Sequence, residues 1–168
     1  MKCLVLMGVQ NDNVSWNEMT DMTFRQNKDA ILSRLDKITR FIIDQREESW
    51  AIILLMDIHS QGSYCKINTW GADLIPRCNI PYSFSSSKFP NISFFCVYRH
   101  NSIQDDNALC NIMNKFKEHD IVYIMGFNTK YLSTLKSVSN VLEKQGVKNV
   151  SIINLMQENT NLFLMDSC

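Results

Sequence analysis

The chain has 168 residues, of which 45% are hydrophobic and 20% are charged, and its 17 basic residues balance its 17 acidic residues. The length suits one substantial core, so we expect residues 1–168 to form a single domain. A net charge of zero provides no field that would attract nucleic acid or an anionic membrane, and no apolar run is long enough for a membrane span or a signal peptide. The sequence therefore predicts a cytoplasmic protein without nucleic-acid or membrane partners.

The first third of the chain alternates apolar and polar segments. Residues 2–7 form an apolar run that predicts a buried strand, whereas residues 10–26 are polar and predict a long loop. A helix is predicted over residues 27–46, because apolar residues recur there at helical spacing: Ile31, Leu35, Ile38 and Ile42. A second buried strand is predicted at residues 51–56.

Residues 57–93 interrupt this regularity. They contain two glycines, three prolines and a serine cluster within residues 83–87, which favours irregular surface structure. A loop of this length inside a compact domain is uncommon unless it forms a functional site.

The remainder of the chain returns to alternating elements. We predict strands at residues 94–98, 121–125 and 148–154, and helices at residues 102–118, from about residue 129 to Gly146, and within residues 155–168. Strands that alternate with helices predict a three-layer α/β/α fold with a mostly parallel sheet of five or six strands. In such a sheet the ligand crevice lies at the carboxyl ends of the strands.

The six cysteines are scattered, with no C-x-x-C pair and no histidine at zinc-finger spacing. This pattern is typical of reduced thiols, several of which we expect in the core.

Four segments, taken in order, resemble the isochorismatase-like cysteine hydrolases, the family that includes the nicotinamidases. The resemblance covers residues 2–154. The segments are L-V-L-M-G-V-Q-N-D-N at 4–13, D-I-H at 57–59 with Y-C-K-I-N-T-W-G-A-D-L at 64–74, Lys88 with S-F-F at 93–95, and G-F-N-T-K-Y-L-S at 126–133.

The resemblance implies a catalytic Asp, Lys and Cys, and this chain departs from that triad. The three positions hold Gly8, Lys88 and Leu132. Glycine cannot act as a base and leucine cannot act as a nucleophile, so neither covalent nor acid–base steps can run through them. Loss of a nucleophile alone commonly removes orders of magnitude of rate.

The metal site implied by the nicotinamidase branch is also incomplete. Asp57 and His59 stand at two ligand positions, but Tyr64 occupies the third. Two ligands would hold zinc only weakly, and tyrosine substitutes poorly for imidazole. The alternative is that Asp57 and His59 fix a loop by hydrogen bonds. No other cofactor is expected.

Lys88 is left without the carboxylate and thiolate of the implied triad. Burial of an unpaired ammonium costs several kcal/mol, so we expect a balancing carboxylate such as Asp12 or Asp57, exposure to water, or an anionic ligand. A ligand in this pocket would contact Asp12, Lys88 and the start of the helix predicted from about residue 129, where Phe127, Asn128 and Leu132 stand.

Two functions remain open from the sequence. The first is a catalytically silent protein that binds a small metabolite or a protein partner. The second is a hydrolase of a small amide, ester or vinyl ether with a rearranged site around Lys88, Asp57 and His59.

Other residues offer less favourable catalytic routes. Ser133 points about 100° away from the nucleophile position around a helix, and neither Cys65 nor Cys96 stands at a helix start that would lower its pKa. The resemblance also implies a homo-oligomer, for which Trp70, Tyr82 and Phe84 could provide an interface.

Overall fold

The computed structural model describes residues 2–20, 22–44, 49–62, 64–73, 75, 92–99, 111, 113–117, 120–126 and 132–154. The helix predicted within residues 155–168 lies outside these ranges. Most of the helix predicted at 102–118 also lies outside them, and of its described residues Asn111 and Met113 are helical.

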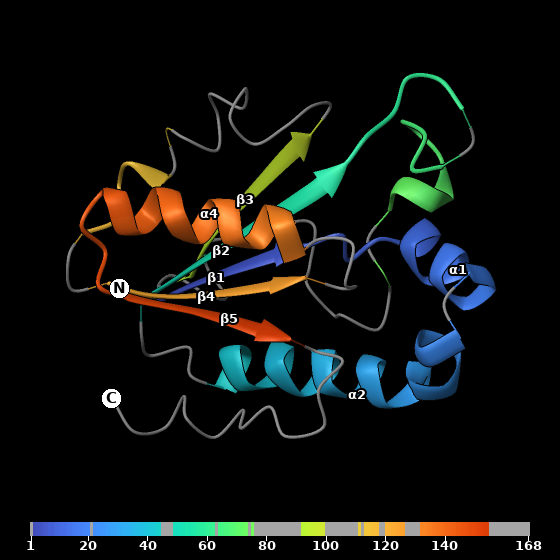
Figure 1. Ribbon diagram of the computed structural model, residues 1–168, viewed down its shortest axis with the longest axis horizontal. Coiled ribbons are helices and arrows are strands. Elements are labelled where there is room, and N and C mark those ends of the chain that lie inside the picture. Colours follow the sequence, from blue (N-terminus) through green and yellow to red (C-terminus); the bar gives the residue numbers. More distant parts are fainter. Residues whose placement is uncertain are drawn as a thin grey trace.

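Five strands form one sheet in the order β3-β2-β1-β4-β5, and every neighbouring pair is parallel (Figure 1). The sheet confirms all five predicted strands, with ends shifted by at most two residues. The strands are β1 (Lys2–Met7), β2 (Trp50–Asp57), β3 (Ile92–Arg99), β4 (Ile121–Gly126) and β5 (Asn149–Asn154). Because β1 is central and the order reverses beside it, the carboxyl ends of β1 and β4 flank a topological switch point.

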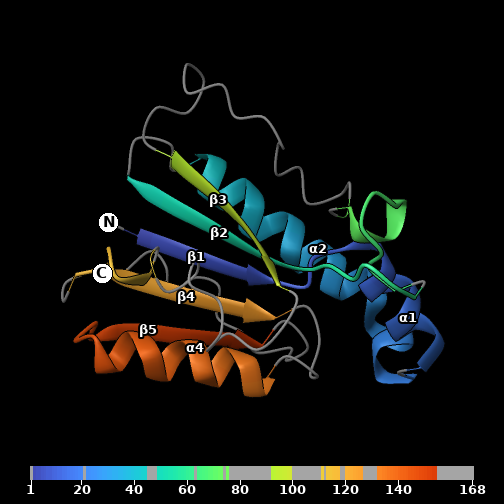
Figure 2. The ribbon, with the colours of Figure 1, turned by 90° about the horizontal axis from the view of Figure 1, so that it is seen from above.

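Two long helices cover opposite faces of the sheet, which confirms the predicted three-layer fold (Figure 2). One face of β1 packs with α2 (Met22–Asp44), and the other packs with α4 (Leu132–Lys144). Side chains alternate across β1: Leu4 and Leu6 join the α2 cluster, whereas Cys3, Val5 and Met7 join the α4 cluster. Both faces of the strand are therefore core, which explains its continuous apolar run.

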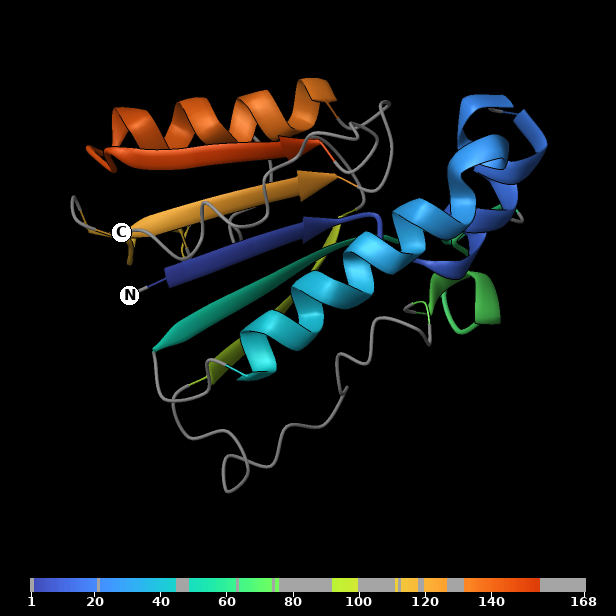
Figure 3. The same cartoon turned by 90° about the horizontal axis from the view of Figure 1, so that it is seen from below.

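The predicted loop at residues 10–26 is wrong. This segment forms α1 (Asn11–Thr20), and α2 begins at Met22, five residues before the predicted start of that helix. The sequence N-D-N-V-S-W-N-E-M-T has no apolar stripe, because α1 does not cover the sheet. It packs instead on α2 and on the short 3-10 helix η1 (Trp70–Ala72), beyond the carboxyl ends of the strands (Figure 3).

The segment that follows β2 is irregular, as predicted, over the part that the structure describes. It contains bends, turns and η1, and His59 and Lys66 form an isolated parallel bridge. Within the described residues, none of the helices combines the length and the apolar character that crossing a bilayer requires.

Candidate functional site

Gly8 ends the central strand at the switch point. Its φ is +71°, and its N–H donates to the carbonyl of Leu55 at 3.1 Å. Met7, directly before it, pairs with Gly126 of β4 and is fully buried. The backbone at residue 8 therefore adopts a conformation that favours glycine, and it presents no side chain to the crevice.

Gln10 joins the two segments that border this edge of the sheet. Its side chain is fully buried. The amide nitrogen donates to the carbonyl of Asp57 at 2.8 Å and to the carbonyl of Ala72 at 2.9 Å, while the amide oxygen accepts from the N–H of Asp57 at 2.8 Å. One side chain thus ties the end of β2 to η1.

The first turn of α1 is bound to the same loop. The side chain of Asn11 donates to the carbonyl of Trp70 at 2.8 Å, and its backbone N–H donates to the carbonyl of Asp73 at 3.0 Å. One carboxylate oxygen of Asp12 accepts from the N–H of Cys65 at 2.6 Å. These bonds explain why a segment of weak helical pattern is a helix here, since its amino end is held by tertiary contacts.

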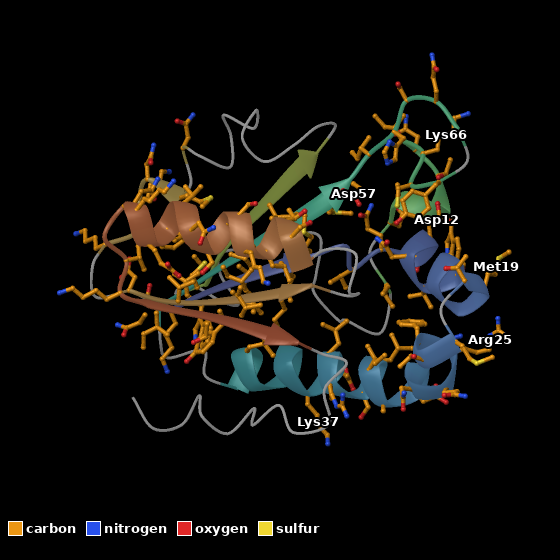
Figure 4. The ribbon with its side chains drawn as sticks, in the orientation of Figure 1. Asp12, Met19, Arg25, Lys37, Asp57 and Lys66 are labelled. Atoms are coloured by element: carbon orange, nitrogen blue, oxygen red, sulfur yellow. The ribbon has the colours of Figure 1, made fainter. Side chains whose placement is uncertain are left out.

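Asp12 also lies in contact with Gly71. A Cβ atom at residue 71 would stand 1.9 Å from the carboxylate oxygen Oδ2 of Asp12. Glycine at residue 71 leaves room for this carboxylate where it lies. Figure 4 shows Asp12 on α1, beyond the end of β2 that Asp57 marks.

Cys65 is a buried, structural residue in this arrangement. Its φ is +43°, and Asn68 also has a positive φ, at +61°. The thiol lies 3.9 Å from the carbonyl of Gly71, to which it donates weakly. The side chain is fully buried, as is typical of a structural cysteine.

Asp57 and His59 stand at the carboxyl end of β2, as predicted. The imidazole of His59 is exposed, with its ring centroid 5.9 Å from that of Tyr64. The loop is fixed by the backbone of His59, which donates to Cys65 and accepts from Ile67, both at 3.0 Å. The Tyr64 hydroxyl donates to the side-chain oxygen of Asn13.

The predicted metal ligands do not form a complete set in the part of the chain that the structure describes. No group of three or more His, Cys, Asp or Glu side chains is close enough there to hold a metal ion. The third position, Tyr64, bonds to Asn13.

The remaining predicted site residues are only partly placed. Leu132 is the first residue of α4, and Ser133, which follows it, is exposed. Lys88, Phe127 and Asn128 lie outside the described residues, and so do Tyr82 and Phe84. Asp12 was one of two carboxylates that could balance Lys88, and that pairing stays a prediction because Lys88 is not described. The Asp12 carboxylate accepts from the backbone N–H of Cys65.

Three residues that organise this edge were not predicted from the sequence: Gln10, Asn11 and Gly71. Each lies inside a segment that resembles the family pattern. Their match to the family pattern could have identified them. Hydrophobic periodicity could not, because it carries no information about polar residues in loops.

Comparison with known proteins supports the fold. No family model and no curated protein matches the sequence. Solved structures with the same fold include a protein described as an isochorismatase hydrolase from Oleispira antarctica, with 14% identity, a TM-score of 0.56 and coverage of 90% of this chain and 72% of that one.

Two further structures are similar to a comparable degree. N-carbamoylsarcosine amidase from Thermoplasma acidophilum has 12% identity and a TM-score of 0.57, with 91% of this chain and 80% of that chain covered. Nicotinamidase/pyrazinamidase PncA from Bacillus subtilis has 15% identity and a TM-score of 0.56, with 98% and 92% covered. The chain therefore has an isochorismatase-like fold, and the predicted resemblance is confirmed at the level of the fold.

Proposed function

We propose that this chain is a non-hydrolytic protein of isochorismatase-like fold that binds a small polar metabolite at the carboxyl edge of its sheet. The observation that carries the proposal is Gly8, with φ of +71°, at the end of the central strand. The resemblance implies a catalytic carboxylate at this position. Here there is no side chain, and the backbone conformation itself favours glycine.

The cysteine-dependent hydrolysis that the resemblance implies needs a nucleophile and a base in addition to Lys88. A thiolate must attack the carbonyl carbon, and a base must accept the thiol proton and return it to the leaving group. Leu132 stands where the resemblance implies the thiol, and it has no lone pair to donate. With both groups absent, the covalent route has neither its nucleophile nor its base.

The carboxylate of Asp12, a described acidic residue at this edge of the sheet, already accepts a hydrogen bond. Asp12 accepts the Cys65 N–H and lies against Gly71, so movement of its carboxylate toward the switch point would leave that N–H without its acceptor. Asp12 therefore supports the loop, and it does not replace the missing base.

Polar groups that suit ligand binding remain at the same edge. Asp57 is the last residue of β2, and the exposed His59 follows that strand. Lys88 matches the family pattern in the sequence. A carboxylate, an imidazole and an ammonium provide hydrogen-bond donors and acceptors for a small amide or carboxylate ligand. We favour a metabolite over a protein partner because Asp57 and His59 lie at the carboxyl end of β2, the edge at which ligands bind in open α/β sheets.

The catalytic part of the proposal is tested by turnover. The purified chain is incubated with nicotinamide, pyrazinamide and N-carbamoylsarcosine, the compounds on which the named relatives act, and ammonia release is measured. We expect release at the rate of the protein-free control. Turnover that is abolished in His59→Ala or Asp57→Asn would contradict the proposal and would favour the rearranged hydrolase.

The binding part is tested separately by ligand-observed NMR, with nicotinamide, pyrazinamide and N-carbamoylsarcosine as the probes. We expect saturable binding that is weakened about tenfold by His59→Ala, the effect of losing one good hydrogen bond. Gln61→Ala, an exposed change in the same loop, is the matched control and should bind as the unmodified chain does. Absence of binding for all three compounds would contradict the metabolite proposal.

A further inference from the structure

The side chains of four consecutive residues, at and directly before the start of α1, hold the segment that follows β2. Their hydrogen bonds reach partners that stand 47 to 62 residues later in the chain. The pairs are Gln10 with Asp57 and Ala72, Asn11 with Trp70, Asp12 with Cys65, and Asn13 with Tyr64. The segment is therefore tied to α1 at several points, from the end of β2 to η1.

The loop between β2 and η1 is organised around the backbone of His59. The N–H of His59 donates to the carbonyl of Cys65, and its carbonyl accepts from the N–H of Ile67, both at 3.0 Å. The carboxylate of Asp12 accepts from the N–H of Cys65 at 2.6 Å. These bonds leave the His59 side chain exposed, with the ring of Tyr64 beside it at 5.9 Å between centroids. Side chains at residues 59 and 64 could therefore reach a common ion.

The hydrogen bond of Tyr64 nevertheless opposes metal binding. Its hydroxyl donates to the side-chain oxygen of Asn13, and an amide oxygen can only accept, so the phenol keeps its proton. Protein groups bind metal ions through lone pairs that carry no proton. Asn13 is fully buried, so turning the Tyr64 hydroxyl toward an ion would take this donor away from a buried amide oxygen.

We propose that the hydrogen bond between Asn13 and Tyr64 replaces a metal ion as the link that holds this loop at the edge of the sheet. A metal bound by Asp57, His59 and residue 64 would join the end of β2 to the loop. Here α1 and the residue before it make that connection, with Gln10 at the end of β2 and Asn13 at residue 64. The loop is complete without a metal and excludes one. This role does not depend on the proposed metabolite binding.

The response of the unmodified chain to metal ions tests the first part of the proposal. We expect the same melting temperature after treatment with a chelator and after addition of zinc, because an ion that does not bind the folded chain cannot stabilise it. A melting temperature that falls in chelator would overturn the proposal. A rise in zinc that is present in the unmodified chain and absent in His59→Ala would overturn it too, since the ion would then be bound at this loop.

Hydrogen exchange tests the link itself. Tyr64→Phe removes only the hydroxyl, and Asn13→Ala removes its acceptor. Each should speed exchange at the Cys65 and Ile67 amides about tenfold while the amides of β1 keep their rates, and the double variant should exchange no faster than the single variants. Ser15→Ala, an exposed change on α1, is the matched control and should leave these rates unchanged. Unchanged exchange in both single variants, or effects that add in the double variant, would contradict the proposed link.

A further variant tests whether Tyr64 excludes the ion. Tyr64→His completes a set of one carboxylate and two imidazoles with Asp57 and His59. We expect zinc to bind this variant at least about tenfold more tightly than it binds Tyr64→Phe, as measured by competition with a chromophoric chelator. His59→Ala in the same background should remove the gain. Equal zinc affinity in Tyr64→His and Tyr64→Phe would overturn the proposal, because residue 64 would then not stand where the ion would be held.

Discussion

At the scale of single residues, the most restrictive contact in the site is between the Asp12 carboxylate and Gly71. The carboxylate holds the Cys65 N–H and occupies the space that a side chain at residue 71 would need. The two residues lie on different elements, so this contact links α1 to η1. A change at one position therefore acts through the other.

The first prediction is a double-mutant cycle at this contact. Gly71→Ala should lower the free energy of unfolding by about 3 kcal/mol, because the new methyl group overpacks the site and displaces a charged hydrogen-bond acceptor. In an Asp12→Ala background the same change should cost less than about 1 kcal/mol, because the obstructing carboxylate is gone. Chemical denaturation of the four proteins measures the coupling, and additive losses would show that Gly71 does not act through Asp12.

Cys3 provides a prediction about pH. Burial, with the negative charge of Asp120 as a smaller cause, raises the pKa of the Cys3 thiol far above its ordinary value of 9.0. The folded chain therefore keeps this thiol protonated at alkaline pH, whereas the unfolded chain releases the proton above pH 9.0. Because the unfolded state then binds fewer protons, stability falls as the pH rises.

We expect Cys3 alone to remove about 1.4 kcal/mol of stability between pH 8 and pH 10. The comparison is with Cys3→Ala, which is less stable at every pH because it leaves a cavity, but lacks this slope. Urea denaturation at each pH gives both curves. If the two proteins lose stability in parallel above pH 9.0, the thiol ionises in the folded state and the assigned shift is wrong.

At the scale of elements, the Gln10 side chain connects the end of β2 to η1 through its hydrogen bonds to Asp57 and Ala72. Gln10→Leu would leave the N–H and the carbonyl of Asp57 and the carbonyl of Ala72 without their partner. We expect a loss of about 3 kcal/mol or more in the free energy of unfolding, with faster hydrogen exchange at the Asp57 amide. The control Asn27→Ala removes an exposed hydrogen bond to Thr23 and should cost less than about 0.5 kcal/mol. Unchanged exchange at Asp57 in Gln10→Leu would contradict the role of this side chain.

The elements also show what the sequence could and could not predict. The five strands were predictable because each is a short apolar run, and in β1 both faces are core. α1 was not predictable from pattern, because its contacts are with α2 and η1 and its amino end is fixed by Asn11 and Asp12. Tertiary hydrogen bonds across more than fifty residues override a weak local preference.

For the candidate site, the sequence predicted the carboxyl edge of the sheet as its location but did not predict the hydrogen bonds within it. Gly8 and Leu132 were recognisable as departures from the family pattern, and the carboxyl edge followed from the parallel sheet. The hydrogen bonds of Gln10 to Asp57 and Ala72 were not predicted, because a position in a predicted loop gives no indication that its polar side chain is fully buried. The positive φ of Gly8 is likewise a property of the folded backbone alone.

At the scale of the whole molecule, the fold alone does not make a hydrolase. The parallel sheet with a helix on each face is complete around β1, and structures described as hydrolases share it at TM-scores of 0.56 and 0.57. Activity depends on how accurately a few groups are aimed, and an error of about 1 Å can cost a hundredfold in rate. The backbone conformation at a position that lacks the implied catalytic side chain therefore decides whether a substitution there can restore activity.

The last prediction follows from this condition. Gly8→Asp/Leu132→Cys returns the residue types that the resemblance implies, yet we expect ammonia release from nicotinamide to stay at the protein-free rate. A side chain at φ of +71° costs about 1–2 kcal/mol and leaves the strand in a direction set by that conformation. Gly146→Ala, at φ of +89° with open space around it, is the matched control for the backbone cost and should lose a similar amount of stability. Measurable hydrolysis by the double variant would mean that residue 8 readily adopts the extended conformation, and that the proposed lack of activity would rest on two side chains alone.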